Sequence, residues 1–146
     1  MSWNDAKSFC MNEGGKLFEP RDSAENSEVP NYAFNTARLE VFWFGIEDLS
    51  SEGTFVYASN GDSLAFTNWA PNEPDDLGDQ NCVRLYTSYE WDDYFCKDGL
   101  MSVCERVGDP PPPSSGGNLI HKATTCVDLK VTYSLLRKRG IRAMHP

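Results

Sequence analysis

The pattern of apolar and polar positions at the start of the chain predicts a helix. In residues 2–13 apolar side chains recur at helical spacing, at Trp3, Ala6, Phe9 and Cys10. Gly14 and Gly15 follow directly, and glycine is the usual residue just past a helix end. We therefore expect this helix to end at the glycine pair.

A second helix is predicted after residue 20. Asp22 followed by Glu25 resembles a capping box, but Pro30 disfavours the helix interior because it lacks an N–H and clashes with the preceding turn. We therefore expect the regular part of this helix to cover residues 27–38. The side chains predicted to face inward are Val29, Ala33 and either Thr36 or Ala37.

Short apolar runs later in the chain predict strands. Residues 41–46, VFWFGI, are rich in strand formers and read as a buried strand. Further short strands are predicted at residues 54–57, 82–85, 90–92 and 100–106. Short strands that follow helices, with a long irregular segment among them, indicate an α+β fold.

A change in composition divides the chain. Residues 109–118, DPPPPSSGGN, are typical of a linker that is stiff at first and then flexible. We therefore predict a domain at residues 1–106, a linker at 107–126 and a tail at 127–146. Apolar residues alternate with polar ones in residues 127–133, which predicts one strand in the tail.

Charge separates the same parts. Residues 107–146 carry six Lys/Arg and two Asp/Glu, a charge of +4, so the total of −9 leaves −13 for residues 1–106. Such an acidic body argues against nucleic acid and anionic membranes as partners, and it is compatible with bound cations. No apolar run is long enough for a membrane span.

Cysteine usage points to an oxidising compartment. Five cysteines in 146 residues favour two disulfides with one thiol left over, and hence an extracellular or secreted domain. Zinc is not predicted, because there is no C-x-x-C pair and both histidines, His121 and His145, lie in the tail. Met1 leads directly into the first helix without a signal peptide, so we expect a fragment or an incomplete gene model.

Carboxylates are concentrated in residues 69–96. They are Glu73, Asp75, Asp76, Asp79, Glu90, Asp92 and Asp93. By itself such a run also fits a solvated loop, but gathered in one place these groups would need a cation. Calcium suits them, because it takes six to eight oxygen ligands. The segment lacks an EF-hand loop, and Cys82 and Cys96 flank the gap between its two acidic packets.

The same carboxylates do not predict an enzyme. A glycosidase acid pair needs one carboxyl group kept protonated in an apolar pocket, whereas Glu73, Asp92 and Asp93 occur in a polar segment. Trp69 and Trp91 are more typical of core packing than of sugar stacking.

Several motifs in order make residues 1–106 resemble the C-type lectin-like domain. They are Trp3, Ala6 and Cys10 in the first helix, then Gly14-Gly15-Lys16-Leu17, Trp43-Phe44-Gly45-Ile46, Glu52-Gly53, Asn68-Trp69, Glu73-Pro74-Asp75, Cys82, Trp91-Asp92-Asp93, Cys96 and Val103-Cys104. The resemblance implies the disulfides Cys10–Cys104 and Cys82–Cys96. It also implies that the strand which precedes the first helix in this family is missing here.

The resemblance further implies Ca²⁺ as a cofactor. The principal site carries over to Glu73, Asp75, Gln80, Asp92 and Asp93, with a cis Glu73–Pro74 bond. A secondary site carries over to Asp48, Glu52, Asp76 and Asn81.

Two positions depart from the family pattern: Gln80 stands where Glu is usual, and Asp92 where Asn is usual. Both types of oxygen bind calcium, but an ionised Asp cannot donate a hydrogen bond to a sugar hydroxyl. The sugar-binding residues implied are Glu73, Asp75, Gln80 and Asp92, with Gln80 as the one amide donor.

Two functions therefore stay open. The first is a calcium-dependent carbohydrate-binding module whose partner is a glycan or glycoprotein, and the intact Glu73-Pro74-Asp75 triplet favours it. The second is a protein-binding domain of the same fold in which calcium only shapes the loops, which Gln80 and Asp92 favour. The monosaccharide is not specified, since Glu-Pro-Asp is a hybrid of the mannose-type and galactose-type triplets.

The missing strand would leave an open edge on the final strand of the domain. Open edges invite another strand, so residues 127–133 are a candidate to pair there, within the chain or across a dimer; the rival expectation is a disordered tail. Cys126 offers an alternative dimer contact.

Overall fold

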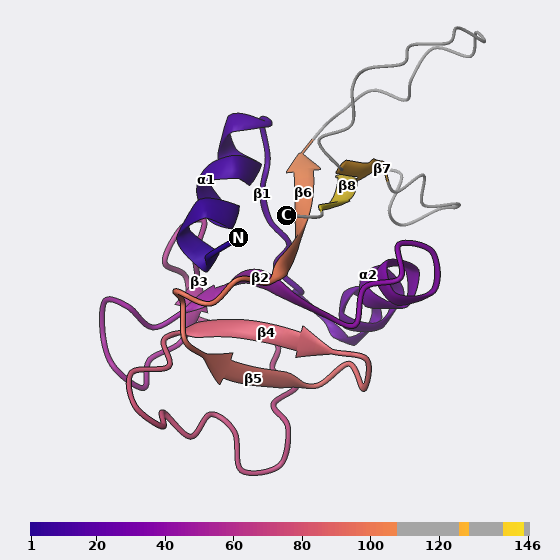
Figure 1. Ribbon diagram of the computed structural model, residues 1–146. Helices are drawn as coiled ribbons and strands as arrows, with labels where there is room; N and C mark the ends of the chain where they lie inside the picture. The colour runs from indigo at the N-terminus through magenta and orange to yellow at the C-terminus, as the bar shows by residue number, and fades with distance from the viewer. Residues whose placement is uncertain (108–125, 129–138, 145–146) are drawn as a thin grey trace, which may run out of the picture.

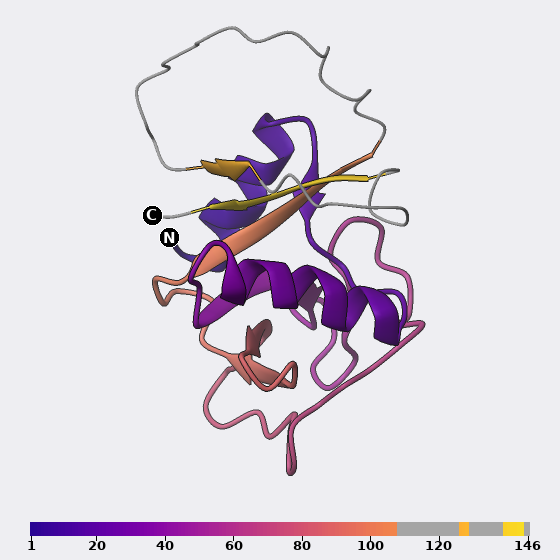
Figure 2. The same ribbon diagram turned by 90° about the vertical axis from the view of Figure 1, so that its right-hand side faces the viewer.

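The computed structural model describes residues 1–107, 126–128 and 139–144, and it has the α+β fold that the sequence predicts. The elements in chain order are α1 (Trp3–Asn12), β1 (Lys16–Leu17), α2 (Ser23–Asn35), β2 (Val41–Glu47), β3 (Val56–Tyr57), β4 (Cys82–Tyr86), β5 (Trp91–Tyr94), β6 (Met101–Val107), β7 (Cys126–Asp128) and β8 (Arg139–Met144). The long loop between β3 and β4 projects away from α1 in both views (Figures 1 and 2). This loop carries the first acidic packet.

The first helix forms as predicted. Ser2 caps α1, since its hydroxyl accepts a hydrogen bond from the Asp5 N–H at 3.3 Å. Gly14, with φ of 76°, ends the turn that follows the helix. The buried positions Trp3, Ala6 and Cys10 face the interior, so the helical spacing of apolar residues identified the buried side correctly.

The second helix begins earlier than predicted, at Ser23 instead of residue 27. Asp22 accepts a hydrogen bond from the Glu25 N–H at 2.8 Å, which starts the helix, and Pro30 is accommodated inside it with its ring buried. The prediction gave too much weight to the proline and too little to this cap. The helix also ends earlier than predicted, and Arg38 beyond it has a positive φ of 59°.

The sheet is built around β2. Antiparallel β4 and β5 lie on one side of β2, and β6 lies parallel to it on the other, in the order β5-β4-β2-β6-β8-β7. The strand predicted at residues 90–92 is Trp91–Tyr94, and Glu90 lies just before it, where its carbonyl accepts from the Tyr86 N–H at 3.2 Å and closes the hairpin. As a result Asp92 and Asp93 both lie within β5.

The tail differs from the prediction. β8 (Arg139–Met144) covers the edge of β6 in antiparallel register, and β7 (Cys126–Asp128) pairs with β8 and not with β6. Only the first two positions of the predicted strand at 127–133 belong to β7; residues 129–133 lie outside the described residues. The segment that pairs with the edge of β6 is therefore residues 139–144 and not the predicted strand at residues 127–133.

Aromatic packing fixes β5 to the long loop. Trp91 is fully buried and makes edge contacts with Phe44, Phe66 and Trp69 at centroid distances of 5.2, 5.7 and 5.5 Å. Its ring N–H donates to Asn26 of α2 at 2.6 Å. The tryptophans flanking the acidic segment are therefore packing residues, as expected.

Both predicted disulfides are present, Cys10–Cys104 and Cys82–Cys96. The first joins α1 to β6, and the second joins the start of β4 to the chain just after β5. No helix among the described residues is long and apolar enough to cross a membrane.

Candidate functional site

The predicted calcium ligands come from four segments at the loop end of the domain. The long loop between β3 and β4 contains Glu73, Asp75 and Asp76, and its last residues, just before β4, are Gln80 and Asn81. Strand β5 contains Asp92 and Asp93. The segment that follows β2 contains Asp48 and Glu52. The Cys82–Cys96 disulfide ties two of these segments together. The Glu73–Pro74 bond is cis, as predicted.

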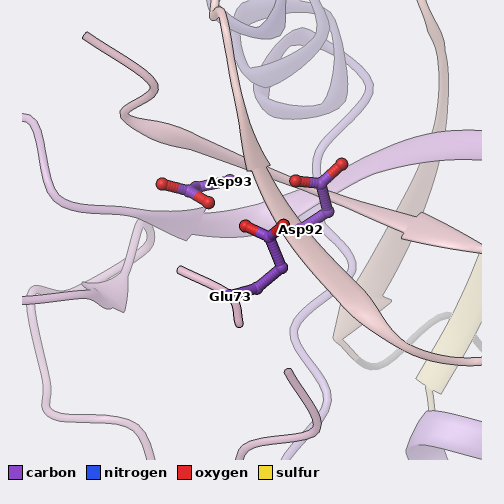
Figure 3. A group of neighbouring side chains, drawn as sticks. All are labelled: Glu73, Asp92 and Asp93. Carbon is purple, nitrogen blue, oxygen red and sulfur yellow. The ribbon is translucent and has the colours of Figure 1, made fainter. Parts of the chain in front are cut away.

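Three carboxylates of the predicted principal site converge. Glu73, Asp92 and Asp93 each offer an oxygen, and these oxygens lie within 4.8 Å of one another. Figure 3 shows the carboxyl group of Glu73 between those of Asp92 and Asp93. Three like charges this close repel one another strongly unless a proton or a cation is shared among them.

Glu73 has an unsatisfied oxygen and a raised pKa in this cluster. Its Oε2 atom is buried and has no hydrogen-bond donor among the described residues. Burial, contact with Asp93 and the charges of Asp92, Asp75 and Asp93 raise the pKa of Glu73 to about 7. A buried carboxylate oxygen without a donor is unfavourable in a folded protein, so this atom is a candidate metal ligand.

Asp93 holds the long loop in place. Its side chain is completely buried, and its two oxygens accept from the backbone N–H groups of Asp75 at 3.1 Å and Asp76 at 2.8 Å. Charged acceptors make stronger hydrogen bonds than neutral ones. Asp93 therefore joins β5 to the loop directly behind the cis proline.

The two remaining predicted ligands of the principal site, Asp75 and Gln80, both contact one backbone N–H group outside the three-carboxylate cluster. Asp75 and Gln80 both accept from the N–H of Leu77, at 3.2 and 2.9 Å. Gln80 is nearly buried, whereas Asp75 is exposed. The structure thus brings Glu73, Asp92 and Asp93 together and places Asp75 and Gln80 at the rim of the same loop.

An ion pair at the site was not predicted from the sequence. Arg84 of β4 lies directly across from Asp92 of β5 in the sheet, and its Nε and Nη2 donate to Asp92 Oδ2 at 2.9 and 2.6 Å. The hydroxyl of Tyr86 donates to the same oxygen at 2.9 Å. The period-two spacing of Arg84 and Tyr86 indicates that their side chains share one face of a strand. The sequence does not show the register of β4 and β5, and this register places Asp92 beside them.

The predicted secondary site is also gathered. Asp48 is buried; its Oδ2 accepts from the Gly53 N–H at 2.8 Å, while its Oδ1 has no donor among the described residues. Asn81 Oδ1 is likewise buried without a donor, and the Asn81 carbonyl accepts from the Asp48 N–H at 3.2 Å. Burial raises the pKa of Asp48, and the charges of Asp76 and Asp93 add to this.

Glu52 belongs to the same group. Loss of hydration and the charges of Asp48 and Asp76 raise its pKa. Three of the four predicted secondary ligands, Asp48, Glu52 and Asp76, therefore lie close enough to repel one another, and the fourth, Asn81, has a buried side-chain oxygen without a donor among the described residues.

These residues fit calcium. Unpaired buried oxygens occur at both predicted positions, on Glu73 at the principal one and on Asp48 and Asn81 at the secondary one. Carboxylate and amide oxygens are the ligands that Ca²⁺ prefers, and a divalent cation would satisfy these atoms and neutralise the repulsion.

Comparison with known proteins agrees with the fold and the motifs. The Lectin C-type domain family matches residues 1–106. Pulmonary surfactant-associated protein D of Bos taurus is 36% identical over 105 residues, which are 71% of this chain and 28% of that protein. Collectin-43 of Bos taurus is 36% identical over 108 residues, 71% of this chain and 33% of that protein.

The chain thus spans about a third of the length of these relatives. Among solved structures, the C-type carbohydrate-recognition domain of cow CD23 is 32% identical, with a TM-score of 0.64 over 75% of this chain and 83% of that one. By the family match, the relatives and the fold together, the chain belongs to the Lectin C-type domain family.

Proposed function

We propose that residues 1–106 form a calcium-dependent carbohydrate-binding domain. The principal calcium ligands would be Glu73, Asp75, Gln80, Asp92 and Asp93. A secondary, structural calcium would be held by Asp48, Glu52, Asp76 and Asn81. The observation that carries the proposal is the donorless buried oxygen of Glu73 between Asp92 and Asp93, next to a cis proline.

The residues of the chain have distinct parts in this function. Calcium, when bound, supplies a positive centre at which the hydroxyl groups of a sugar can bind. Asp93 fixes the loop through the N–H groups of Asp75 and Asp76, so that Glu73 stays turned toward β5. Gln80 has an amide that can donate to a ligand, whereas Asp75 and Asp92 can only accept when ionised.

The relatives support a sugar ligand. The cow CD23 domain was solved in the presence of GlcNAc2Man3 oligosaccharide, and the two Bos taurus relatives are a surfactant-associated protein and a collectin. The family consists of binding modules, in agreement with the prediction that the chain is not an enzyme. Two disulfides are typical of proteins in oxidising compartments, so we place this domain outside the cell.

A protein ligand is the second candidate, and one observation favours it. Asp92 Oδ2 already accepts three hydrogen bonds, from Arg84 and Tyr86, and has no lone pair left for a sugar hydroxyl. In that case calcium would order the loops without touching the ligand.

A glycan array probed with calcium and with EDTA tests the proposal. We expect the native chain to bind a limited set of glycans in calcium and to lose this binding in EDTA. The Glu73→Gln variant should give no binding signal in either condition. Asp62→Asn is the matched control, because it removes the same charge from an exposed loop position whose contact is with Asn60. Calcium binding without any glycan signal would favour the protein ligand, and no calcium binding would reject both.

The pKa of Glu73 predicts how the metal-free domain responds to pH. The folded state raises this pKa from 4.5 to about 7, so it favours the protonated form. The stability from this group is fully present below pH 4.5 and is lost as pH rises through 7. With EDTA the melting temperature should fall over this range, and calcium should reverse the fall above pH 7.

Thermal unfolding at several pH values, with EDTA and with calcium, measures this effect. Glu73→Gln should flatten the EDTA curve, because its side chain does not titrate. Apparent calcium affinity should also decrease as pH falls below about 7, since protons compete for the carboxylate. A native EDTA curve as flat as that of the variant would contradict the prediction.

A further inference from the structure

We propose that Arg84 is a positioning residue for the principal calcium site, acting through Asp92. It holds one oxygen of Asp92 so that the other is presented to Glu73 and Asp93, and its charge offsets that of Asp92. This inference rests on the proposed calcium site and assigns a role to a residue outside the set of predicted ligands.

The geometry separates the two oxygens of Asp92. Oδ2 accepts from Arg84 Nε, Arg84 Nη2 and the Tyr86 hydroxyl, at 2.9, 2.6 and 2.9 Å. Among the described residues no hydrogen bond is directed to Oδ1. Asp92 also belongs to the cluster whose oxygens lie within 4.8 Å of one another. Oδ1 is therefore the oxygen that remains for a metal.

Arg84 is itself held rigidly. Its guanidinium lies 3.3 Å from the centroid of the Tyr94 ring and 4.8 Å from that of Tyr86, and the Arg84 and Asp92 side chains are only 15% and 14% exposed. The Tyr86 hydroxyl donates to the same Asp92 oxygen at 2.9 Å. A planar guanidinium that is stacked and paired loses little further freedom when it orients a carboxylate.

Charge gives the second part of the argument. The four acidic side chains among the proposed ligands, Glu73, Asp75, Asp92 and Asp93, carry a formal charge of −4. Arg84 reduces this to −3 at the one ligand that it contacts. The pair thus provides an oxygen ligand with almost no net charge, much as an amide would.

An ordinary cross-strand ion pair is the competing explanation, in which Arg84 only stabilises the β4–β5 hairpin. The two explanations differ for Asp92→Asn. Asparagine has one oxygen, and the donors of Arg84 would claim it, which turns the NH₂ group toward the cluster where it cannot bind a cation. Without Arg84, the amide oxygen is free to face the metal, and the Tyr86 hydroxyl can accept from the NH₂ group.

A double-mutant cycle on calcium affinity tests this, with isothermal titration of the native chain, Arg84→Gln, Asp92→Asn and the double variant. We expect Asp92→Asn to weaken calcium binding about a hundredfold in the native background, and about tenfold or less beside Arg84→Gln. Arg84→Gln alone has two opposed effects, because the lost orientation of Asp92 weakens binding and the lost positive charge strengthens it, so the coupling in the cycle carries the test.

Lys97→Gln is the matched control, because it removes an equal charge from an exposed side chain that lies over the Phe95 ring. Its cycle with Asp92→Asn should be additive. If Arg84→Gln does not fold, Arg84→Met also removes the charge while keeping a long unbranched side chain, and it carries the same expectation. An equal loss for Asp92→Asn in both Arg84 backgrounds would overturn the role of Arg84, whereas a native chain that binds no calcium would overturn the calcium site itself.

Discussion

Replacing Asp93 by Asn should largely abolish calcium binding at the principal site. Asp93 is the completely buried carboxylate that contacts both the acidic cluster and the N–H groups of Asp75 and Asp76. An Asn at this position would turn its NH₂ group either toward one of those N–H groups or toward the metal. Because the loss of groups behind a metal ligand already costs 10- to 100-fold in affinity, we expect a loss of at least about a hundredfold here.

The metal-free form should be affected much less. Asp93→Asn loses a charged hydrogen bond, worth about 1.5–3 kcal/mol, but it also relieves the repulsion with Glu73. We therefore expect the native chain to melt at a clearly higher temperature in calcium than in EDTA, and the variant to keep at most the smaller shift that the proposed secondary site supplies. The exposed-position control Asp62→Asn should keep the native shift, and a variant that keeps it too would remove Asp93 from the calcium site.

Part of the fold followed from local signals and part from the family resemblance. The buried side of α1 follows from the helical spacing of its apolar residues, whereas the two disulfides and the cis bond before Pro74 were implied by the resemblance to the C-type lectin-like domain. Trp91 and Trp69 were predicted to be packing residues; Trp91 lies in the core and the partly buried Trp69 packs against it, with ring centroids 5.5 Å apart. Such features survive small errors in element boundaries.

Features that depend on strand register were not predictable. The strand with Asp92 was expected to start at Glu90, one residue early, and nothing local specifies that Arg84 lies across from Asp92. A shift of one residue turns every side chain of a strand to the other face. The ion pair that changes the chemistry of Asp92 therefore required the structure.

The same limit explains the tail and the second helix. Alternation in residues 127–133 indicated a strand, but the edge of β6 pairs with β8, and edge pairing depends on reach and register more than on alternation. At α2, a penalty at Pro30 was weighed against a cap at Asp22 without knowing that Pro30 would be buried. Tertiary contacts decided both cases.

Removing either disulfide should lower the free energy of unfolding, and we expect the larger loss for Cys10–Cys104. Cys10–Cys104 closes 94 residues and joins α1 to β6, whereas Cys82–Cys96 closes 14 residues around β4 and β5. In the chain-entropy model the paired Ala variants lose about 4–5 and about 3 kcal/mol of unfolding free energy, respectively. Urea unfolding of calcium-free protein measures both values.

Calcium affinity should follow the opposite order. Gln80 precedes Cys82 and Asp93 precedes Cys96, so the shorter bridge holds two proposed ligands in register. Without it, ordering even one more residue on binding costs about 1–2 kcal/mol, so we expect affinity to fall on the order of tenfold. The Cys10→Ala/Cys104→Ala variant, titrated under conditions where it stays folded, should bind within about twofold of the native chain. Equal affinity losses in the two variants would mean that the shorter bridge supports the fold in general and has no particular part in the site.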